Sequence, residues 1–150
     1  MPEISFPPPF AQAEREALGL SADTPEFKIS DIKTDLILIE VIGVYCPVCF
    51  KQAPGFNDLY ARLGRGKAKG RVTMFALAAG SPDTEIQPLI QSGQYKFPIV
   101  SDVKFEAHKL LGEPKTPFTI ICRPNGSILY THLGLIDNID EIYAKIKSFL

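Results

Sequence analysis

The chain has 150 residues, a length that fits one domain with one sizeable core. Hydrophobic residues make up 45% and charged residues 22%, and the net charge of −1 gives no basic field to attract nucleic acid or an anionic membrane. No apolar run is long enough to span a bilayer, and the start, MPEISFPPPF, lacks the positive flank and apolar core of a signal peptide. We therefore expect a cytoplasmic protein, or a periplasmic one if an export leader has been removed.

The first 26 residues are expected to form an N-terminal extension ahead of one domain over residues 27–150. Four of the chain's 13 prolines lie within the first ten residues, so this start should be extended, either as a flexible arm or against the domain. A short helix is expected over 11–18, ended by Gly19. Phe27-Lys28-Ile29 is expected to be a short strand that forms a hairpin with the strand after it.

An apolar strand, two cysteines and a helix follow one another in the next segment. Residues 36–42, LILIEVI, are rich in β-branched side chains, which favours a strand buried on both faces. Apolar residues then recur every three or four positions, which predicts a helix over 47–63 with Pro47 in its first turn. Cys46 and Cys49 therefore lie where a strand gives way to a helix N-terminus. The helix dipole there favours a thiolate, which is the reactive form of cysteine.

The rest of the chain predicts four more strands and three more helices. In chain order we expect a strand at 72–78, a helix opened by Ser81-Pro82-Asp83, a strand at 97–100, a helix at 103–111, strands at 118–122 and 127–133, and a helix from Asp137 to Leu150. Pro124-Asn125-Gly126 predicts a hairpin turn between the last two strands. The order β-α-β-(α-β-α)-β-β-α gives a three-layer α/β sandwich with a mixed sheet.

Four companions of the CxxC pair complete a resemblance to a known family. They are Glu40, six positions before the first cysteine; Tyr45, directly before it; Pro54, five positions after the second; and Thr116-Pro117, ahead of the strand at 118–122. With them, the chain resembles the thioredoxin-fold thiol–disulfide oxidoreductases, in particular the TlpA/ResA branch, over about residues 27–150. The resemblance implies a thioredoxin-like fold of class α/β, in which residues 81–112 are an inserted strand–helix unit.

The resemblance also implies an enzyme that exchanges its own dithiol for disulfides in substrate proteins. Cys46 attacks the substrate disulfide and Cys49 resolves the mixed disulfide. The reductase direction is favoured, because Pro47-Val48 lacks the histidine found between the cysteines of some strongly oxidising relatives. We expect no cofactor, an upstream thiol reductant or reductase as partner, no nucleic acid, no membrane insertion, and a monomer.

Glu40 stands out as a carboxyl group within an otherwise apolar strand. Burial there should raise its pKa, which suits a group that exchanges a proton with Cys49 directly or through a water. A structural acid on a solvated face, or one paired with a cation, is the alternative. Lys28 or Lys51 is the candidate counter-charge.

Five residues are expected to meet the substrate, namely Tyr45, Pro47, Val48, Thr116 and Pro117. The resemblance implies a cis peptide bond before Pro117. Such a bond would present the backbone of Thr116 to an extended peptide, which could pair with it as a strand does.

Three other functions compete with disulfide exchange. A zinc site needs two more ligands, and only Cys122, His108 and His132 are available, each alone on its segment; Cys122 is otherwise expected to be a buried, inert thiol. A peroxiredoxin-like thiol peroxidase is favoured by the segment 81–112, but Cys46 lacks the P-x-x-x-T-x-x-C pattern. A binding module that kept the fold is the third, and a Cys46 pKa near that of a free thiol, about 8.5, would favour it.

Overall fold

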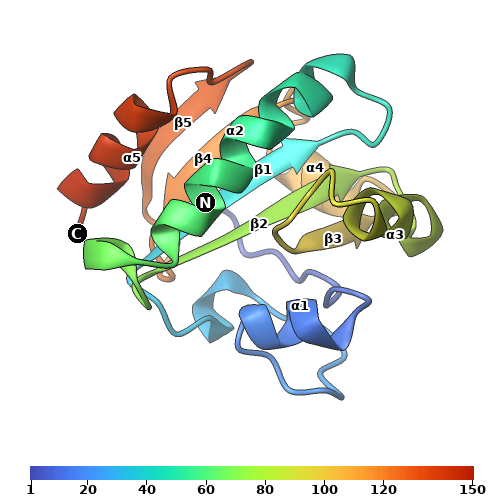
Figure 1. Cartoon of the computed structure of the whole chain (residues 1–150). Coiled ribbons are helices and arrows are strands. Elements are labelled where there is room, and N and C mark those ends of the chain that lie inside the picture. Colours follow the sequence, from blue (N-terminus) through green and yellow to red (C-terminus); the bar gives the residue numbers. More distant parts are fainter.

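One mixed sheet of five strands, in the order β3-β2-β1-β4-β5, runs through the molecule (Figure 1). The computed structural model describes all 150 residues. The strands are β1 (Leu36–Ile42), β2 (Val72–Ala79), β3 (Ile99–Asp102), β4 (Phe118–Cys122) and β5 (Ile128–Leu133). β1, β2 and β3 are parallel, whereas β4 runs antiparallel to both β1 and β5. Helical crossovers and a terminal hairpin produce these directions, as the sequence predicted.

Helices cover both faces of the sheet. They are α1 (Gln12–Ala17), α2 (Pro47–Leu63), α3 (Asp83–Gln91), α4 (Glu106–Leu110) and α5 (Ile139–Ser148), with 3₁₀ turns at Ile29–Asp31 and Gly66–Ala68. α2 and α5 pack together on one face, and α4 and the N-terminal residues lie on the other (Figure 1). The predicted three-layer sandwich is therefore confirmed, including the inserted α3-β3-α4 unit. None of these helices combines the length and apolar character that crossing a membrane requires.

β1 is buried along its whole length and contributes side chains to two hydrophobic cores. Its side chains alternate between the faces of the sheet, so Leu36 and Leu38 join the core beneath α2 while Ile37 and Ile39 join the core on the other face. The same alternation places Glu40 on the α2 side. The strand therefore buries one carboxyl group against the helix that carries the cysteines.

The N-terminal segment lies against the sheet. Phe6 and Phe27 form an isolated antiparallel bridge, and their rings lie 5.4 Å apart and within 5.7 Å of the Phe75 ring from β2. Glu14 of α1 accepts a hydrogen bond of 3.1 Å from the Ile99 N–H at the edge strand. These contacts make the segment part of the core on this face, and the predicted boundary at residue 26 stays a prediction.

The prediction of a strand at Phe27-Lys28-Ile29 is wrong. Only Phe27 forms a bridge, and the chain turns into a 3₁₀ helix from Ile29. The Asp31 carboxylate accepts a hydrogen bond of 2.8 Å from the Lys28 N–H and closes this turn. A local hydrogen bond from a side chain competes with strand pairing, and here it stabilises the turn instead of a strand.

Three predicted boundaries also move. β3 begins two residues later than expected. α4 begins at Glu106 instead of residue 103, because the Asp102 carboxylate accepts hydrogen bonds from the N–H groups of Ala107 and His108, at 3.0 and 2.9 Å. The last helix is capped by Asn138 instead of Asp137, since the Asn138 side chain accepts from the Glu141 N–H at 3.0 Å.

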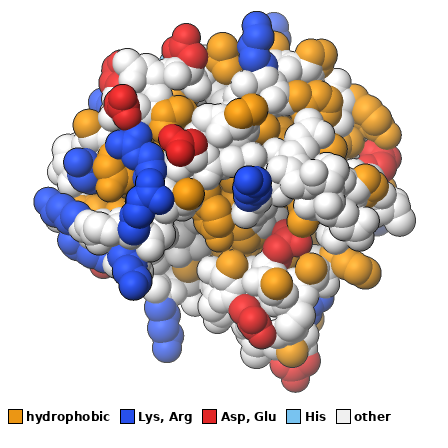
Figure 2. All heavy atoms as spheres, in the orientation of Figure 1, with side chains coloured by type: hydrophobic (Ala, Val, Ile, Leu, Met, Phe, Trp, Pro, Cys, Tyr) orange, Lys and Arg blue, Asp and Glu red, His pale blue; other side chains and the backbone are white.

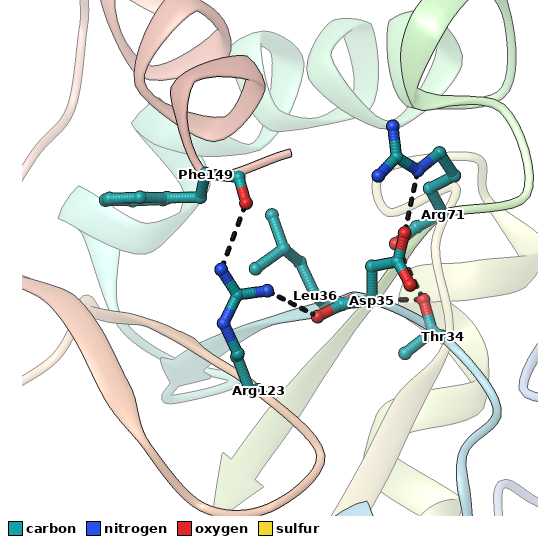
Figure 3. A network of polar contacts seen from close by, with 6 residues as sticks. All are labelled: Thr34, Asp35, Leu36, Arg71, Arg123 and Phe149. Atoms are coloured by element: carbon teal, nitrogen blue, oxygen red, sulfur yellow. Dashed lines mark hydrogen bonds and ion pairs between the residues drawn. The ribbon is translucent and has the colours of Figure 1, made fainter.

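A polar network ties the chain together where β1 begins, at the end of the sheet away from the cysteines (Figure 3). Asp35 Oδ2 pairs with Arg71 Nε at 2.7 Å, and the Asp35 carbonyl accepts from Arg123 at 3.4 Å. Arg123 also donates to the Phe149 carbonyl at 3.1 Å. The network therefore links the starts of β1 and β2 to the β4–β5 turn and to the C-terminus. Its charged groups are partly exposed, so each contact contributes modestly to stability.

Candidate active site

Cys46 caps the helix that follows β1. Its backbone is extended, and its Sγ accepts a hydrogen bond of 3.2 Å from the Cys49 N–H. Pro47 occupies the first turn of α2, where its missing N–H leaves no bond unmade. Both cysteines are free thiols; Cys46 is partly exposed and Cys49 is buried. The strand–cysteine–helix junction is confirmed with the predicted helix bounds.

The two sulfurs ionise very differently. Burial opposes ionisation of Cys46, but hydrogen bonds from the Cys49 thiol, from Thr116 and from the backbone N–H groups at the helix start outweigh it, so the pKa of Cys46 lies below its ordinary value of 9.0. Burial and the hydrogen bond with Cys46 raise the pKa of Cys49 to about 12. As the pH rises, the partly exposed sulfur therefore ionises before the buried one.

Thr116 reaches the cysteines from the start of β4. The Thr116–Pro117 peptide bond is cis, as expected, and the Cys46 thiol donates to the Thr116 carbonyl at 3.8 Å. That contact favours the neutral thiol, whereas the Thr116 side chain favours the thiolate; the lowered pKa of Cys46 shows that the bonds to the thiolate dominate. Neither backbone polar group of Thr116 makes a backbone hydrogen bond. Pro117 itself is buried.

Apolar side chains surround the exposed thiol. Tyr45 is 79% exposed and Val48 44% exposed, and Pro47 is exposed between the cysteines. Figure 2 shows apolar side chains gathered toward the end of the molecule where α2 begins, while Lys and Arg gather where α2 ends, at residues 62–71. The thiol is therefore reached across an apolar surface, not a charged one.

Glu40 is fully buried beneath α2, as its strand position predicted. Burial raises the pKa of Glu40 to about 8, although a hydrogen bond from Gln52 opposes this rise. No lysine compensates its charge. Lys28 pairs with Glu3 at 2.8 Å on the surface, and Lys51 is exposed, so the counter-charge considered from the sequence is wrong.

Two buried polar residues near Glu40 were not predicted from the sequence as part of the site. Gln52 of α2 donates its amide N–H to Glu40 Oε1 at 3.0 Å and accepts from the Ile136 N–H at 2.6 Å. Tyr95 is fully buried with no hydrogen-bond partner for its hydroxyl, and its pKa is raised first by burial and then by the charges of Glu40 and the cysteines. Gln52 was detectable as a polar residue on the apolar stripe of α2; Tyr95 offered no comparable pattern.

The remaining candidate ligands stay apart from this site. Cys122 belongs to the core on the opposite face of the sheet, and burial raises its pKa to about 11. His108 Nε2 lies 2.8 Å from the Pro114 carbonyl, and His132 Nε2 lies 3.2 Å from the Leu135 carbonyl. No three His, Cys, Asp or Glu side chains are arranged to hold a metal ion.

Relatives of the chain share this architecture. Residues 8–131 match the model of the AhpC/TSA family. The thiol-disulfide oxidoreductase ResA of Halalkalibacterium halodurans is 30% identical over 142 residues, which cover 91% of this chain and 78% of the relative. The protein of the same name from Bacillus cereus strain ATCC 10987 is 24% identical over 146 residues, covering 89% and 82% of the two chains.

Solved structures agree on the fold. The exposed lipoprotein thioredoxin of Streptococcus pneumoniae superposes with a TM-score of 0.70 at 14% identity and covers 98% of this chain and 99% of its own. StoA from Bacillus subtilis gives a TM-score of 0.66 at 19% identity, with 83% and 90% covered. The chain therefore belongs to the AhpC/TSA family, and its resemblance to the ResA-like thiol–disulfide oxidoreductases of the thioredoxin fold, predicted from the CxxC segment and its companions, is confirmed.

Proposed function

We propose that this protein reduces disulfide bonds in substrate proteins by exchange with the Cys46–Cys49 dithiol. The observation that carries the proposal is the contrast between the two sulfurs. One is partly exposed at a helix N-terminus with a lowered pKa, and the other is buried with a raised pKa. Such a pair supplies an attacking group and a resolving group in a fixed order.

In the first step, the Cys46 thiolate attacks one sulfur of the substrate disulfide. The substrate S–S bond breaks, a mixed disulfide forms, and the leaving sulfur departs as a thiolate that takes a proton from solvent. The Cys49 N–H, 3.2 Å from Cys46 Sγ, stabilises the attacking anion without moving.

In the second step, Cys49 attacks Cys46 and releases the other substrate sulfur as a thiol. Cys49 must lose its proton, and Glu40 is the proposed acceptor on the buried side, directly or through a water. With a pKa of about 8, Glu40 is ionised in a minority of molecules near neutral pH, and in those molecules it can accept the proton of Cys49. Two electrons pass to the substrate, and the enzyme is left with a Cys46–Cys49 disulfide that an upstream thiol reductant or reductase must reduce.

The proposed substrate contacts lie around Cys46. The exposed side chains of Tyr45, Pro47 and Val48 offer an apolar surface beside the sulfur. The backbone N–H and C=O of Thr116, free of backbone hydrogen bonds, offer strand-like pairing to an extended segment. Buried Pro117 would support Thr116 from below instead of making broad contact.

Substitution of single cysteines tests the scheme through reduction of insulin with dithiothreitol as electron donor. Cys46→Ser should abolish activity, and Cys49→Ser should accumulate a mixed disulfide with the substrate, visible by mass spectrometry. Cys122→Ser is the matched control, because that thiol lies on the opposite face, and it should keep wild-type activity. Full activity in the Cys46→Ser variant would exclude the mechanism.

Glu40→Gln tests the proton acceptor separately. The variant should form the mixed disulfide at the wild-type rate but resolve it about 100-fold more slowly, a typical contribution of a positioned proton acceptor. Equal rates for both steps in the variant and the wild type would remove Glu40 from the mechanism.

The direction of electron flow follows from the reduction potential of the dithiol. A value near −270 mV, about that of thioredoxin, supports the reductase, and one near −120 mV supports an oxidant. Rapid consumption of hydrogen peroxide by the reduced protein would instead favour the peroxiredoxin-like peroxidase. The monomeric state and the cytoplasmic location stay predictions, which light scattering of the pure protein and fractionation of its native cells test.

A further inference from the structure

The buried amide of Gln52 joins three elements beneath the cysteines. It lies three residues after Cys49 on the same side of α2 and is 1% exposed. Its Nε2 donates to Glu40 Oε1 on β1 at 3.0 Å, and its Oε1 accepts from the N–H of Ile136, in the loop after β5, at 2.6 Å. No other side chain hydrogen-bonds to the carboxyl group of Glu40.

The orientation of this amide follows from its backbone partner. A backbone N–H can only donate, so the group of Gln52 facing Ile136 must be the oxygen. The NH₂ group must then face Glu40. A flipped amide would set two donors against each other at Ile136, which a buried site does not tolerate.

The amide therefore makes the two oxygens of Glu40 unequal. Oε1 faces an N–H donor and must act as an acceptor, whether the carboxyl group is charged or neutral. Oε2 is buried with no partner. A proton on Oε1 would point toward the Gln52 N–H, so the proton of neutral Glu40 belongs on Oε2.

We propose that Gln52 is a positioning residue for proton transfer, which holds Glu40 Oε1 as an acceptor and confines the transferable proton to Oε2. The proposal rests on the proposed function, in which Glu40 takes the proton of Cys49. Oε2 is then the single atom of Glu40 that binds and releases the proton. Because Gln52 also accepts from the Ile136 N–H, the position of that proton depends on the loop after β5.

Two substitutions separate proton positioning from simple anchoring of the loop. Gln52→Met has a similar length and loses both hydrogen bonds. Ile136→Pro removes the loop N–H and keeps the Gln52 amide N–H that donates to Glu40. An anchoring role predicts that both variants change the titration of Glu40 alike, whereas a positioning role predicts that only Gln52→Met does.

The readout is the titration of Glu40 itself. The infrared C=O band of its protonated carboxyl group is identified by subtracting the spectrum of Glu40→Gln and is followed from pH 5 to 11 in the reduced protein. Loss of a hydrogen bond to the charged form should move the midpoint upward from about 8 by about one to two pH units in Gln52→Met, whereas Ile136→Pro, which keeps that hydrogen bond, should leave it near about 8. The pH profile of single-turnover reduction of a disulfide peptide should move with it.

The Glu40→Gln background supplies the second control. Adding Gln52→Met there should leave the pH profile of the reaction unchanged, because the titrating group is already gone. A Gln52→Met midpoint equal to that of the wild type, or a profile shifted by Gln52→Met in the absence of Glu40, would overturn the proposal. If the wild type exchanges no disulfides, the proposed function fails, while the infrared titration still reports whether Gln52 governs Glu40.

Discussion

Replacing Glu40 by Gln should make the protein more stable at alkaline pH. Glu40 is fully buried and its carboxyl group receives one hydrogen bond, so folding strongly favours its neutral form. Gln has nearly the same shape and can still accept from Gln52, but it cannot ionise. The variant therefore removes the titration of Glu40 and keeps the packing and the hydrogen bond from Gln52.

The sign and size of the effect follow from the pKa. The folded state holds the proton of Glu40 up to a pKa of about 8, against an ordinary value of 4.5. The contribution to stability is therefore fully present below about pH 4.5 and is lost as the pH rises through about 8. At about 1.4 kcal/mol for each pH unit, this interval corresponds to about 5 kcal/mol. A non-titrating Gln keeps that contribution, so the variant should exceed the wild type by several kcal/mol at pH 9 and match it within about 1 kcal/mol at pH 4.5.

Urea unfolding of the reduced protein at pH 4.5, 6, 7, 8 and 9 measures this difference. Glu141→Gln, which removes an exposed carboxyl group instead of a buried one, is the matched control and should not gain several kcal/mol between pH 4.5 and pH 9. A difference for Glu40→Gln that is the same at pH 4.5 and pH 9 would show that burial does not hold this carboxyl group neutral, and the reasoning would fail.

Two further predictions concern the residues around the cysteines and the turn after β2. Val48→His should lower the pKa of Cys46 further and raise the reduction potential by tens of millivolts, because a cation beside the sulfur stabilises the thiolate; equilibration with glutathione measures it. Gly80→Ala should cost about 2 to 3 kcal/mol in thermal unfolding, since Gly80 has φ +73° and a Cβ there would lie 2.1 Å from the Phe105 ring. Gly93→Ala, with φ +81° and no atom within 4 Å of the added Cβ, should show only the backbone cost of about 1 kcal/mol.

The parts of the molecule that the sequence predicted well are those set by neighbours along the chain. An apolar run, a cysteine cap and a helical stripe are local patterns, and both β1 and α2 have the predicted bounds. The buried position of Glu40 follows from the same alternation. The failed strand near Phe27 is also local in origin, because one hydrogen bond from the Lys28 N–H to Asp31 converts an apolar segment into a turn.

Long-range contacts explain what could not be predicted. Gln52 and Ile136 lie 84 residues apart, and no spacing rule connects a helix residue to one N–H in a distant loop. The charge partner of Glu40 was sought among the lysines, yet the structure supplies a neutral amide. A neutral partner leaves the pKa of Glu40 raised, whereas a nearby lysine would have lowered it.

The electrostatics of the site also give the proposed reaction an order. Burial contributes most to the raised pKa values of Cys49 and Glu40, but interactions with Cys46 raise both further. Once Cys46 is bonded to a substrate sulfur, it is no longer a thiolate that carries a charge and accepts a hydrogen bond from the Cys49 thiol, so those contributions vanish. Ionisation of Cys49 and of its proposed proton acceptor becomes easier only after the first step has occurred. The resolving thiol is therefore kept protonated while it has nothing to resolve and is activated by formation of the mixed disulfide itself.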